Sequence, residues 1–340
     1  YSALRSLLFY FDAEVAHKIT INLLKTYKIK NNISHPSLSC DVFGLNFTNP
    51  VGLAAGFDKN SEVPNNIINL GFGFSEVGTV TPFPQKGNSK PRVFRLKNED
   101  AIINRLGFNN EGFEAVKERL CKRENNIIGV NIGANKNSED FINDYLKGIK
   151  FFSSIASYLT INISSPNTPG LRDLEAIDSF SSLLDEIDQL KKKSLEINLP
   201  ILIKISPDIN NEDLENLCEK VLSSSIDGLI VSNTTISRYS LSSEEKGGLS
   251  GEPLFDISTR KLSKVYKYTE GKIPLIGVGG VDSAEKAYKK IKNGASLIQL
   301  YTGLVYKGPR LINEINKGLI EFIEKDGFKN ISEAVGVEVN

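Results

Sequence analysis

Short apolar runs recur along the chain from Asn49 onward, and each contains β-branched residues that favour strands. Eight runs follow one another: PVGLAAG, GFSEVGTV, IIGVNIG, YLTINIS, PILIKIS, DGLIVSN, PLIGVGG and ASLIQLY. Most of the segments between them can hold a helix, such as Phe180–Leu195 and Asn211–Ser223. Apolar strands that alternate with helices are typical of a parallel sheet covered on its faces. Eight such units in roughly 280 residues predict an α/β fold, a (β/α)8 TIM barrel, with a doubly wound sheet as the alternative.

The first 30 residues have a helical period instead. Asp12 is a candidate N-cap between two short amphipathic helices, and Glu14 follows it in the first turn of the second helix. The apolar positions are Leu4, Leu7, Leu8 and Phe11 in the first helix, and Val15, Ile19, Leu23 and Tyr27 in the second. Lys30–Ser39 is polar and predicts a linker, and VFGLNF predicts a hairpin. We therefore expect residues 1–39 to form a helical extension with its linker, and residues 40–340 to form the barrel domain.

Composition excludes several classes of function. Lys+Arg and Asp+Glu number 41 each, so no global charge attracts nucleic acid. No run approaches the roughly 20 apolar residues that span a bilayer, and Asp12 and Glu14 argue against a secretory signal. The only histidines are His17 and His35, so we expect neither a Ser-His-Asp triad nor a metal site. The three cysteines lie far apart without a CxxC motif, so we expect no disulfide framework.

Polar residues cluster where the apolar runs end. In a barrel these strand ends meet on one face, where active sites are built. Lys204 is the most informative, because it lies among apolar neighbours in ILIKIS, where a lysine is costly to bury without an anion. Gly277–Gly280 and Tyr301–Gly303 end the last two runs, the place where barrels often bind phosphate. Gly247–Gly251 adds either backbone close to a ligand or a flexible loop.

Taken alone, these residues describe a barrel with a phosphate-bearing ligand, a buried cation and many amide side chains. One interpretation is a flavin enzyme with Lys204 near the electron-rich end of the isoalloxazine. A second is a Schiff-base aldolase with Lys204 as the nucleophile. A third is a non-catalytic phosphate-ligand binder or peripheral membrane protein.

Longer motifs carry a family resemblance. They are FDAEVAH, NPVGLAAGFDKN, EVGTVTPFPQKGNSKPRVFRL, INRLGFNN, GVNIG, NISSPNTPGLR, IKISPD, SNTT, GGLSG, IGVGGV and GASLIQLYT. In this order, and over nearly the whole chain, they resemble class 2, quinone-dependent dihydroorotate dehydrogenases. The resemblance implies that the chain binds FMN, oxidises dihydroorotate to orotate in pyrimidine biosynthesis and reduces a membrane quinone.

The resemblance also implies roles for individual residues. Ser165 would be the catalytic base, where class 1 relatives have a cysteine, and Thr168 is our candidate for a proton relay. His17 and Arg95 would be the polar groups at the inner end of a quinone funnel formed by the first 30 residues. Substrate would contact Lys59, Asn104, Arg105, Leu106, Gly107, Phe108, Asn162, Asn167, Asn233 and Thr234. FMN would contact Ala55, Gly56, Lys59, Thr79, Asn131, Asn162, Lys204, Ser232, Gly251, Gly280, Tyr301 and Thr302.

The funnel hypothesis predicts where the protein works. Without a polybasic cluster, residues 1–30 would adhere to a bilayer mainly through apolar area. We therefore expect peripheral association with the cytoplasmic side of the cell inner membrane, or with the mitochondrial inner membrane in a eukaryote. We expect no obligate protein partner.

Overall fold

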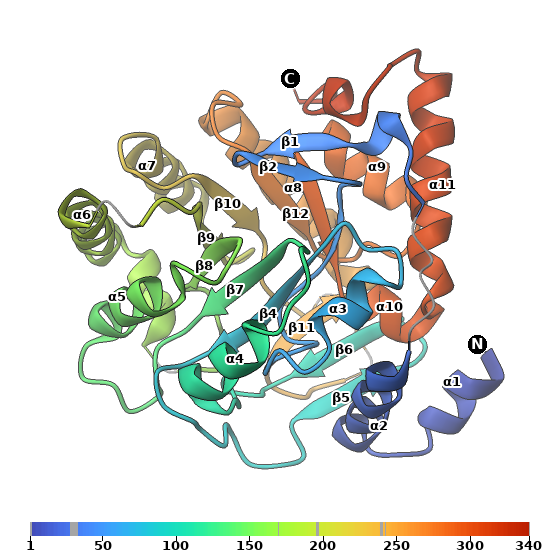
Figure 1. The fold of residues 1–340 in the computed structure, drawn as a ribbon, viewed down its shortest axis with the longest axis horizontal. Helices are drawn as coiled ribbons and strands as arrows, with labels where there is room; N and C mark the ends of the chain where they lie inside the picture. Colours follow the sequence, from blue (N-terminus) through green and yellow to red (C-terminus); the bar gives the residue numbers. More distant parts are fainter. Residues whose placement is uncertain are drawn as a thin grey trace.

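The computed structural model describes residues 2–27, 33–168, 170–194, 197–238, 241 and 243–339. Within these residues, eight parallel strands pair in a closed ring (Figure 1). They are β3 (Val51–Leu53), β4 (Phe74–Val80), β7 (Ile128–Ile132), β8 (Tyr158–Asn162), β9 (Ile201–Ile205), β10 (Gly228–Val231), β12 (Leu275–Val278) and β13 (Leu297–Leu300). Each apolar run supplies one strand, and β13 pairs with β3 to close the ring. The predicted (β/α)8 barrel is confirmed, and the doubly wound alternative is wrong.

Helices surround the ring, as Figure 1 shows. They are α3 (Pro64–Ile68), α4 (Gly112–Leu120), α5 (Phe141–Phe152), α6 (Ile177–Lys193), α7 (Asn211–Leu222), α8 (Phe255–Tyr268), α9 (Ala284–Lys292), α10 (Thr302–Lys307) and α11 (Arg310–Lys325). The predictions for α6 and α7 are confirmed apart from their ends; Leu195 lies outside the described residues. Asn210 explains where α7 begins, because its side chain accepts a hydrogen bond from the Asp213 amide at 2.9 Å.

The barrel strands are buried on both faces, which is why they read as nearly continuous apolar runs. Two glycines make room for large rings inside the barrel. A Cβ added to Gly52 would lie 2.3 Å from the ring of Phe74, and one added to Gly129 would lie 2.1 Å from the ring of Tyr158. At these positions the interior is therefore a packed core, as is typical of this barrel fold.

A small antiparallel sheet was not predicted. It consists of β5 (Val93–Leu96), β6 (Ala101–Asn104) and β11 (Gly248–Gly251). The suggestion that Gly247–Gly251 forms a flexible loop is wrong for β11, whose residues pair one for one with β6, from Gly248 with Asn104 to Gly251 with Ala101. Backbone pairing with a distant strand outweighs the weak strand preference of glycine here.

The two N-terminal helices are confirmed as α1 (Ser2–Leu8) and α2 (Ala13–Thr26), and α2 packs against β5 and α3. Asp12 caps α2 as predicted, since its Oδ1 accepts hydrogen bonds from the amides of Glu14 at 2.9 Å and Val15 at 3.2 Å. Figure 1 shows α2 next to β5 and α1 beyond it, at one side of the barrel.

Between these helices and the barrel lies the stretch predicted as a linker. Residues 28–32 lie outside the described part of the chain. Pro36–Leu38 form a short 3-10 helix, η1, with Leu38 fully buried. The predicted hairpin is confirmed as β1 (Cys40–Val42) and β2 (Leu45–Phe47), which pair antiparallel.

Candidate active site

A cavity of about 400 Å³ lies between the carboxyl ends of the barrel strands, helix α2 and the β5–β6–β11 sheet. Most of the site residues predicted from the sequence line this cavity. They are His17, Ala55, Gly56, Lys59, Thr79, Asn104, Leu106, Gly107, Phe108, Asn162, Ser165, Asn167, Lys204, Ser232, Asn233, Thr234, Gly251, Gly280, Tyr301 and Thr302. Closure of the barrel brings these distant segments together, as expected for strand-end loops of this fold.

Ser165 lies in the loop that follows β8 and is buried, with 6% of its surface exposed. Its Oγ accepts a hydrogen bond from the amide of Asn167 at 3.3 Å, and the hydroxyl retains its own proton to donate. The same loop bends back over β8, because Ser164 Oγ donates to Asn162 Oδ1 at 3.1 Å. Asn167 Nδ2 also reaches Asn104 Oδ1 at 3.4 Å. The hydroxyl of Ser165 is thus held in a short, hydrogen-bonded loop.

Amide and hydroxyl side chains form a connected floor next to Ser165. Asn162 Nδ2 donates to Thr79 Oγ1 at 3.0 Å and to Asn131 Oδ1 at 3.3 Å. Asn233 Nδ2 donates to Asn162 Oδ1 at 3.2 Å, which links β10 to β8. Each amide offers both donors and an acceptor, so this floor suits a planar ligand with alternating N–H and C=O groups.

Lys204 reaches the cavity from β9, with 6% of its surface exposed. Burial lowers the pKa of its ammonium group, and Glu76 on β4 partly opposes that shift. Among the described residues, Lys204 Nζ forms no hydrogen bond or ion pair. A buried cation without a bonded partner suits an anion or an electron-rich ring in the cavity.

Glycines line the opposite end of the cavity, beside the last two barrel strands. Gly251, Gly279 and Gly280 have φ angles of 101°, 114° and 71°, in the region that favours glycine. A Cβ added to Gly280 would also lie 2.5 Å from the Cβ of Phe255. These positions leave bare backbone next to the hydroxyl of Thr302, which is a suitable environment for a phosphate group.

Comparison with known proteins decides the family. A family model described as dihydroorotate dehydrogenase matches residues 37–323. The chain belongs to the dihydroorotate dehydrogenase family. The "Dihydroorotate dehydrogenase (quinone)" of Brucella anthropi is 51% identical over 338 residues, which cover 96% of this chain and 93% of that protein. The protein of the same name from Parvibaculum lavamentivorans is 50% identical over 347 residues, covering 99% and 98%.

Solved structures of the family agree. A crystal structure of the DHODH of Eimeria tenella in complex with ferulenol has a TM-score of 0.91 with this chain at 40% identity, and 96% of each chain is covered. A ligand-free structure from the same organism also has a TM-score of 0.91, at 39% identity. Membership of the dihydroorotate dehydrogenase family confirms the resemblance found in the sequence and sets aside the aldolase and non-catalytic interpretations.

Besides Arg95, which is described below, three residues predicted for the dihydroorotate dehydrogenase site do not line the cavity. Arg105 turns outward, and its Nη1 pairs with Glu245 Oε2 at 2.5 Å. Asn131 lies one layer deeper, hydrogen-bonded to Thr79. Thr168 is buried in the same loop as Ser165, but among the described residues no hydrogen bond joins the side chains of Thr168 and Ser165. Arg105 and Asn131 therefore do not line the cavity, and their assigned contacts, like the relay assigned to Thr168, stay predictions.

The two residues predicted at the quinone funnel lie in different places. His17 lines the cavity, and its ring packs edge-on against Phe57 with the centroids 5.1 Å apart. Burial, and secondarily Lys59, lowers the pKa of His17 to about 3, so its ring is uncharged at neutral pH. Arg95 does not line the cavity. Its guanidinium donates to the carbonyls of Leu8 and Phe11 and so fixes the turn between α1 and α2.

Sequence reasoning missed Glu76, which is fully buried on β4. Its carboxylate accepts four hydrogen bonds at 2.8–3.2 Å, from Asn131, Tyr158, Thr160 and Gln299. Glu76 holds the side chain of Asn131, and its carboxylate partly opposes the lowering of the pKa of Lys204. The signal was present, because a charge inside the apolar run GFSEVGTV is as unusual as the lysine in ILIKIS.

Proposed function

We propose that this member of the family oxidises (S)-dihydroorotate to orotate in de novo pyrimidine (UMP) biosynthesis, with FMN as the hydride acceptor and a membrane quinone as the final oxidant. The observation that carries the proposal is the position of Ser165. It lies in the cavity on the loop after β8, in a chain that matches relatives named dihydroorotate dehydrogenase (quinone) almost from end to end. Its motif NISSPNTPGLR is the one that distinguishes the serine class from the cysteine class in the resemblance.

The cavity has the chemistry that FMN requires. Glycine backbone at Gly279 and Gly280, with the hydroxyl of Thr302, suits its phosphate. Lys204 suits the electron-rich edge of its ring system, because the buried ammonium group has no bonded partner among the described residues. When bound, FMN supplies a two-electron acceptor for the hydride.

Ser165 acts on the substrate as a base. The oxidation removes a proton from C5 of dihydroorotate and a hydride from C6, which leaves a C=C bond. Ser165 Oγ takes the C5 proton, while the Asn167 amide fixes the position of that oxygen. A neutral hydroxyl is a weak base, so it must pass its own proton on as it accepts the new one. Thr168 remains our candidate for that relay.

Lys59 and the amide floor hold the substrate. Lys59 Nζ donates to the carbonyl of Gly56 at 2.7 Å, and its ammonium group lies on the cavity wall. Burial lowers its pKa to about 8, so Lys59 is mostly charged at neutral pH and can pair with the substrate carboxylate. Asn162 and Asn233 match the N–H and C=O edge of the pyrimidine ring.

Quinone enters past the N-terminal helices. Ala13, Glu14, His17 and Lys18 of α2 line the cavity, so this helix is part of its wall. Of the eight exposed large hydrophobic side chains in the described residues, five lie on this extension: Leu7, Tyr10, Phe11, Val15 and Leu23. No helix in the described part of the chain is long and apolar enough to cross a membrane. We infer peripheral attachment to the inner membrane through these side chains.

The purified protein tests this function directly. We expect a yellow protein that releases FMN, and not FAD, on denaturation. Dihydroorotate should bleach the flavin absorbance without oxygen, and a long-tailed quinone in detergent should restore it. A colourless protein, or a flavin that dihydroorotate does not reduce, would contradict the proposal.

A further inference from the structure

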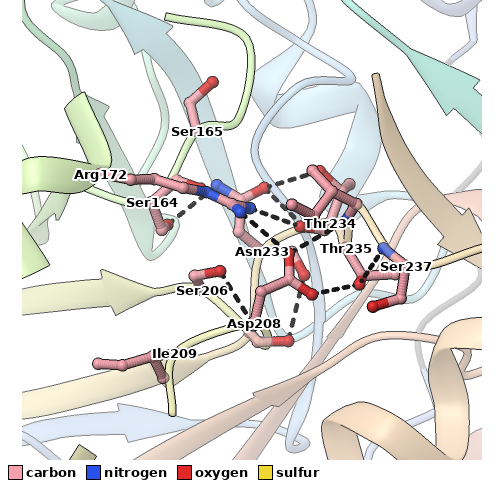
Figure 2. A network of polar contacts seen from close by, with 12 residues as sticks. Ser164, Ser165, Arg172, Ser206, Asp208, Ile209, Asn233, Thr234, Thr235 and Ser237 are labelled. Carbon is pink, nitrogen blue, oxygen red and sulfur yellow. Dashed lines mark hydrogen bonds and ion pairs between the residues drawn. The ribbon is translucent and has the colours of Figure 1, made fainter. Parts of the chain in front are cut away.

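Arg172 lies behind the active-site loops, in the 3-10 helix η2 (Leu171–Glu175) that follows the Ser165 loop. Its guanidinium joins three loops that come from three different barrel strands (Figure 2). Nε donates to the carbonyl of Ser164 at 3.1 Å, in the loop after β8. Nη1 pairs with Asp208 Oδ2 at 2.9 Å, after β9. Nη2 donates to the carbonyl of Thr234 at 3.2 Å, after β10.

Asp208 extends this connection. Its carboxylate accepts hydrogen bonds from the hydroxyl of Thr235 and from the amide of Ile236, the latter at 2.9 Å. Its own amide donates to Ser206 Oγ at 3.0 Å, which holds the turn after β9. The carboxylate therefore ties the loop after β10 to the guanidinium of Arg172, and Figure 2 shows both side chains between the two loops.

A second link joins the loops after β8 and β10 on the side that faces the cavity. Asn233 Nδ2 donates to Ser164 Oγ at 3.0 Å, so the loops after β8 and β10 are also joined in front of Arg172. The side chains of Arg172 and Asp208 are 21% and 15% exposed, and neither residue lines the cavity. They cannot touch the substrate. Arg172 can act through the carbonyls of Ser164 and Thr234, which flank the base and the amide floor, and Asp208 can act through Arg172, Thr235 and Ile236.

We propose that Arg172 and Asp208 are positioning residues for dihydroorotate oxidation: together they fix the Ser165 loop relative to Asn233 and Thr234. The inference rests on the proposed function and adds to it residues outside the cavity. The base must lie within hydrogen-bond reach of C5 while the amides hold the ring, and a misplacement of about 1 Å can cost on the order of a hundredfold in rate. A planar guanidinium with three separately directed donor groups suits this task, whereas an ammonium group is a single point charge.

Three variants separate positioning from general stability. Arg172→Gln removes the ion pair, Arg172→Lys keeps the charge but cannot reach all three acceptors, and Asp208→Asn keeps the shape of the partner. The matched control is Lys191→Gln. Lys191 resembles Arg172 in its contacts: it pairs with Asp227 at 3.1 Å, donates to the carbonyl of Ser225, and its side chain is 20% exposed. This pair, however, lies before β10, at the end of the strand that is remote from the active-site loops.

The two half-reactions are measured separately by stopped flow, with FMN content and Tm for each variant. Arg172→Gln should slow flavin reduction at saturating dihydroorotate by about tenfold or more. Reoxidation by quinone and FMN content should stay within about twofold of the unaltered protein. The rates of flavin reduction in Arg172→Lys and Asp208→Asn should lie between those of Arg172→Gln and the unaltered protein. Lys191→Gln should reduce its flavin at the normal rate even if its Tm drops. Equal losses in both half-reactions, or normal reduction in all three variants, would overturn the inference.

A double-mutant cycle tests whether Arg172 acts through Ser165. If it does, adding Arg172→Gln to Ser165→Ala should slow reduction by less than about threefold, because the base is already absent. An undiminished effect in that background contradicts positioning of the base. The proposed function can be judged independently: if dihydroorotate fails to reduce the flavin of the unaltered protein, that function is wrong, whereas normal reduction with a silent Arg172→Gln rejects only this inference.

Discussion

The two walls of the cavity are built in opposite ways. On the side of β8, β9 and β10, Ser165 and the amide floor belong to a continuous network of hydrogen bonds backed by Arg172 and Asp208. On the side of α2, the wall is held by ion pairs of Glu14 with Arg92 at 2.8 Å and with Lys90 at 3.0 Å, and by Ile21, which packs into the core. The first wall fixes polar groups, as proton and hydride transfer require. The second carries the proposed entrance for the quinone, and we expect it to separate from the barrel locally, which the last prediction below tests.

The α2 side of the cavity also has a distinctive outer surface. The N-terminal wall exposes large apolar side chains, with Tyr10 88% and Leu7 57% exposed. Arg95 is committed to the backbone carbonyls of the α1–α2 turn and lies 4.6 Å from the ring centroid of Phe9. On the proposed function, one wall carries the chemistry of the substrate and the other carries access for the quinone. The predictions below separate these two tasks.

The largest expected effect is that of Ser165→Ala on the polar wall. It should leave FMN bound but slow flavin reduction by dihydroorotate by about a hundredfold or more, the usual contribution of a positioned base. Ser165→Cys should retain some activity, with a pH profile shifted to lower pH because a thiol ionises more readily. Anaerobic stopped-flow reduction measures both variants. A normal rate in Ser165→Ala would remove Ser165 from the chemistry.

Lys204→Ala should have the next largest effect. On the proposed function Lys204 is the buried cation next to the flavin, so its removal costs a charge-assisted interaction and should slow flavin reduction between about ten- and a hundredfold. FMN should also dissociate more readily, which gel filtration followed by fluorescence of the free flavin measures. Lys147→Ala is the control, because Lys147 is a half-exposed lysine on α5, away from this cavity. Normal FMN content together with normal reduction would exclude Lys204 from the site.

A chain that begins at Ser39 tests the other wall. Its flavin should be reduced by dihydroorotate at the normal rate in a single turnover, because the polar wall is complete without α1 and α2. Turnover with a long-tailed quinone should fall by about fivefold or more, since the apolar entrance is gone. If Ile21, which packs into the core, is needed for folding, the substitutions Leu7→Ser and Tyr10→Ser in the full chain make the same test. Equal quinone turnover would leave these helices as packing alone.

The sequence predicted the barrel strands better than the small β5–β6–β11 sheet, and the reason is physical. Barrel strands are buried on both faces, so each leaves an apolar run that can be recognised alone. The strands β5 and β11 are four residues long and only partly buried or glycine-rich, so their pairing with β6 leaves no periodic signal.

The site residues divide in the same way. Strand ends could be predicted because the fold brings them together wherever they lie in the chain. Arg172 could not, because its role depends on contacts with residues 36 and 62 positions away, which no local pattern encodes. Arg95 and Arg105 were placed at the site by motif alone, and the structure turns both toward backbone or surface partners.

The smallest expected effect concerns the attachment of α2, and it depends on pH. His17 has an ordinary pKa of 6.5, and burial lowers it to about 3 while α2 is docked. When the helix is released, His17 regains its ordinary pKa and takes up a proton below about pH 6.5. Docking is therefore strongest above that pH and weakens as pH falls from 6.5 toward 3.

Lys59 and Glu14 also face His17. Burial lowers the pKa of Lys59 to about 8. Although burial opposes the shift, the hydrogen bonds of Arg92 and Lys90 hold the pKa of Glu14 below its ordinary 4.5. Neither group titrates between pH 5.5 and 7.

Hydrogen exchange of the α2 amides measures this release directly. At pH 6, half a unit below the ordinary pKa, protonation of the released helix should raise its population about fourfold over its value at high pH. After correction for the intrinsic exchange rate, the α2 amides should show that rise. His17→Gln should remove it, because glutamine takes up no proton. His35→Gln is the control, since His35 caps η1 and does not line the cavity. A pH dependence that survives His17→Gln would mean that another group governs this wall. Its loss would show that α2 separates from the barrel as His17 gains a proton.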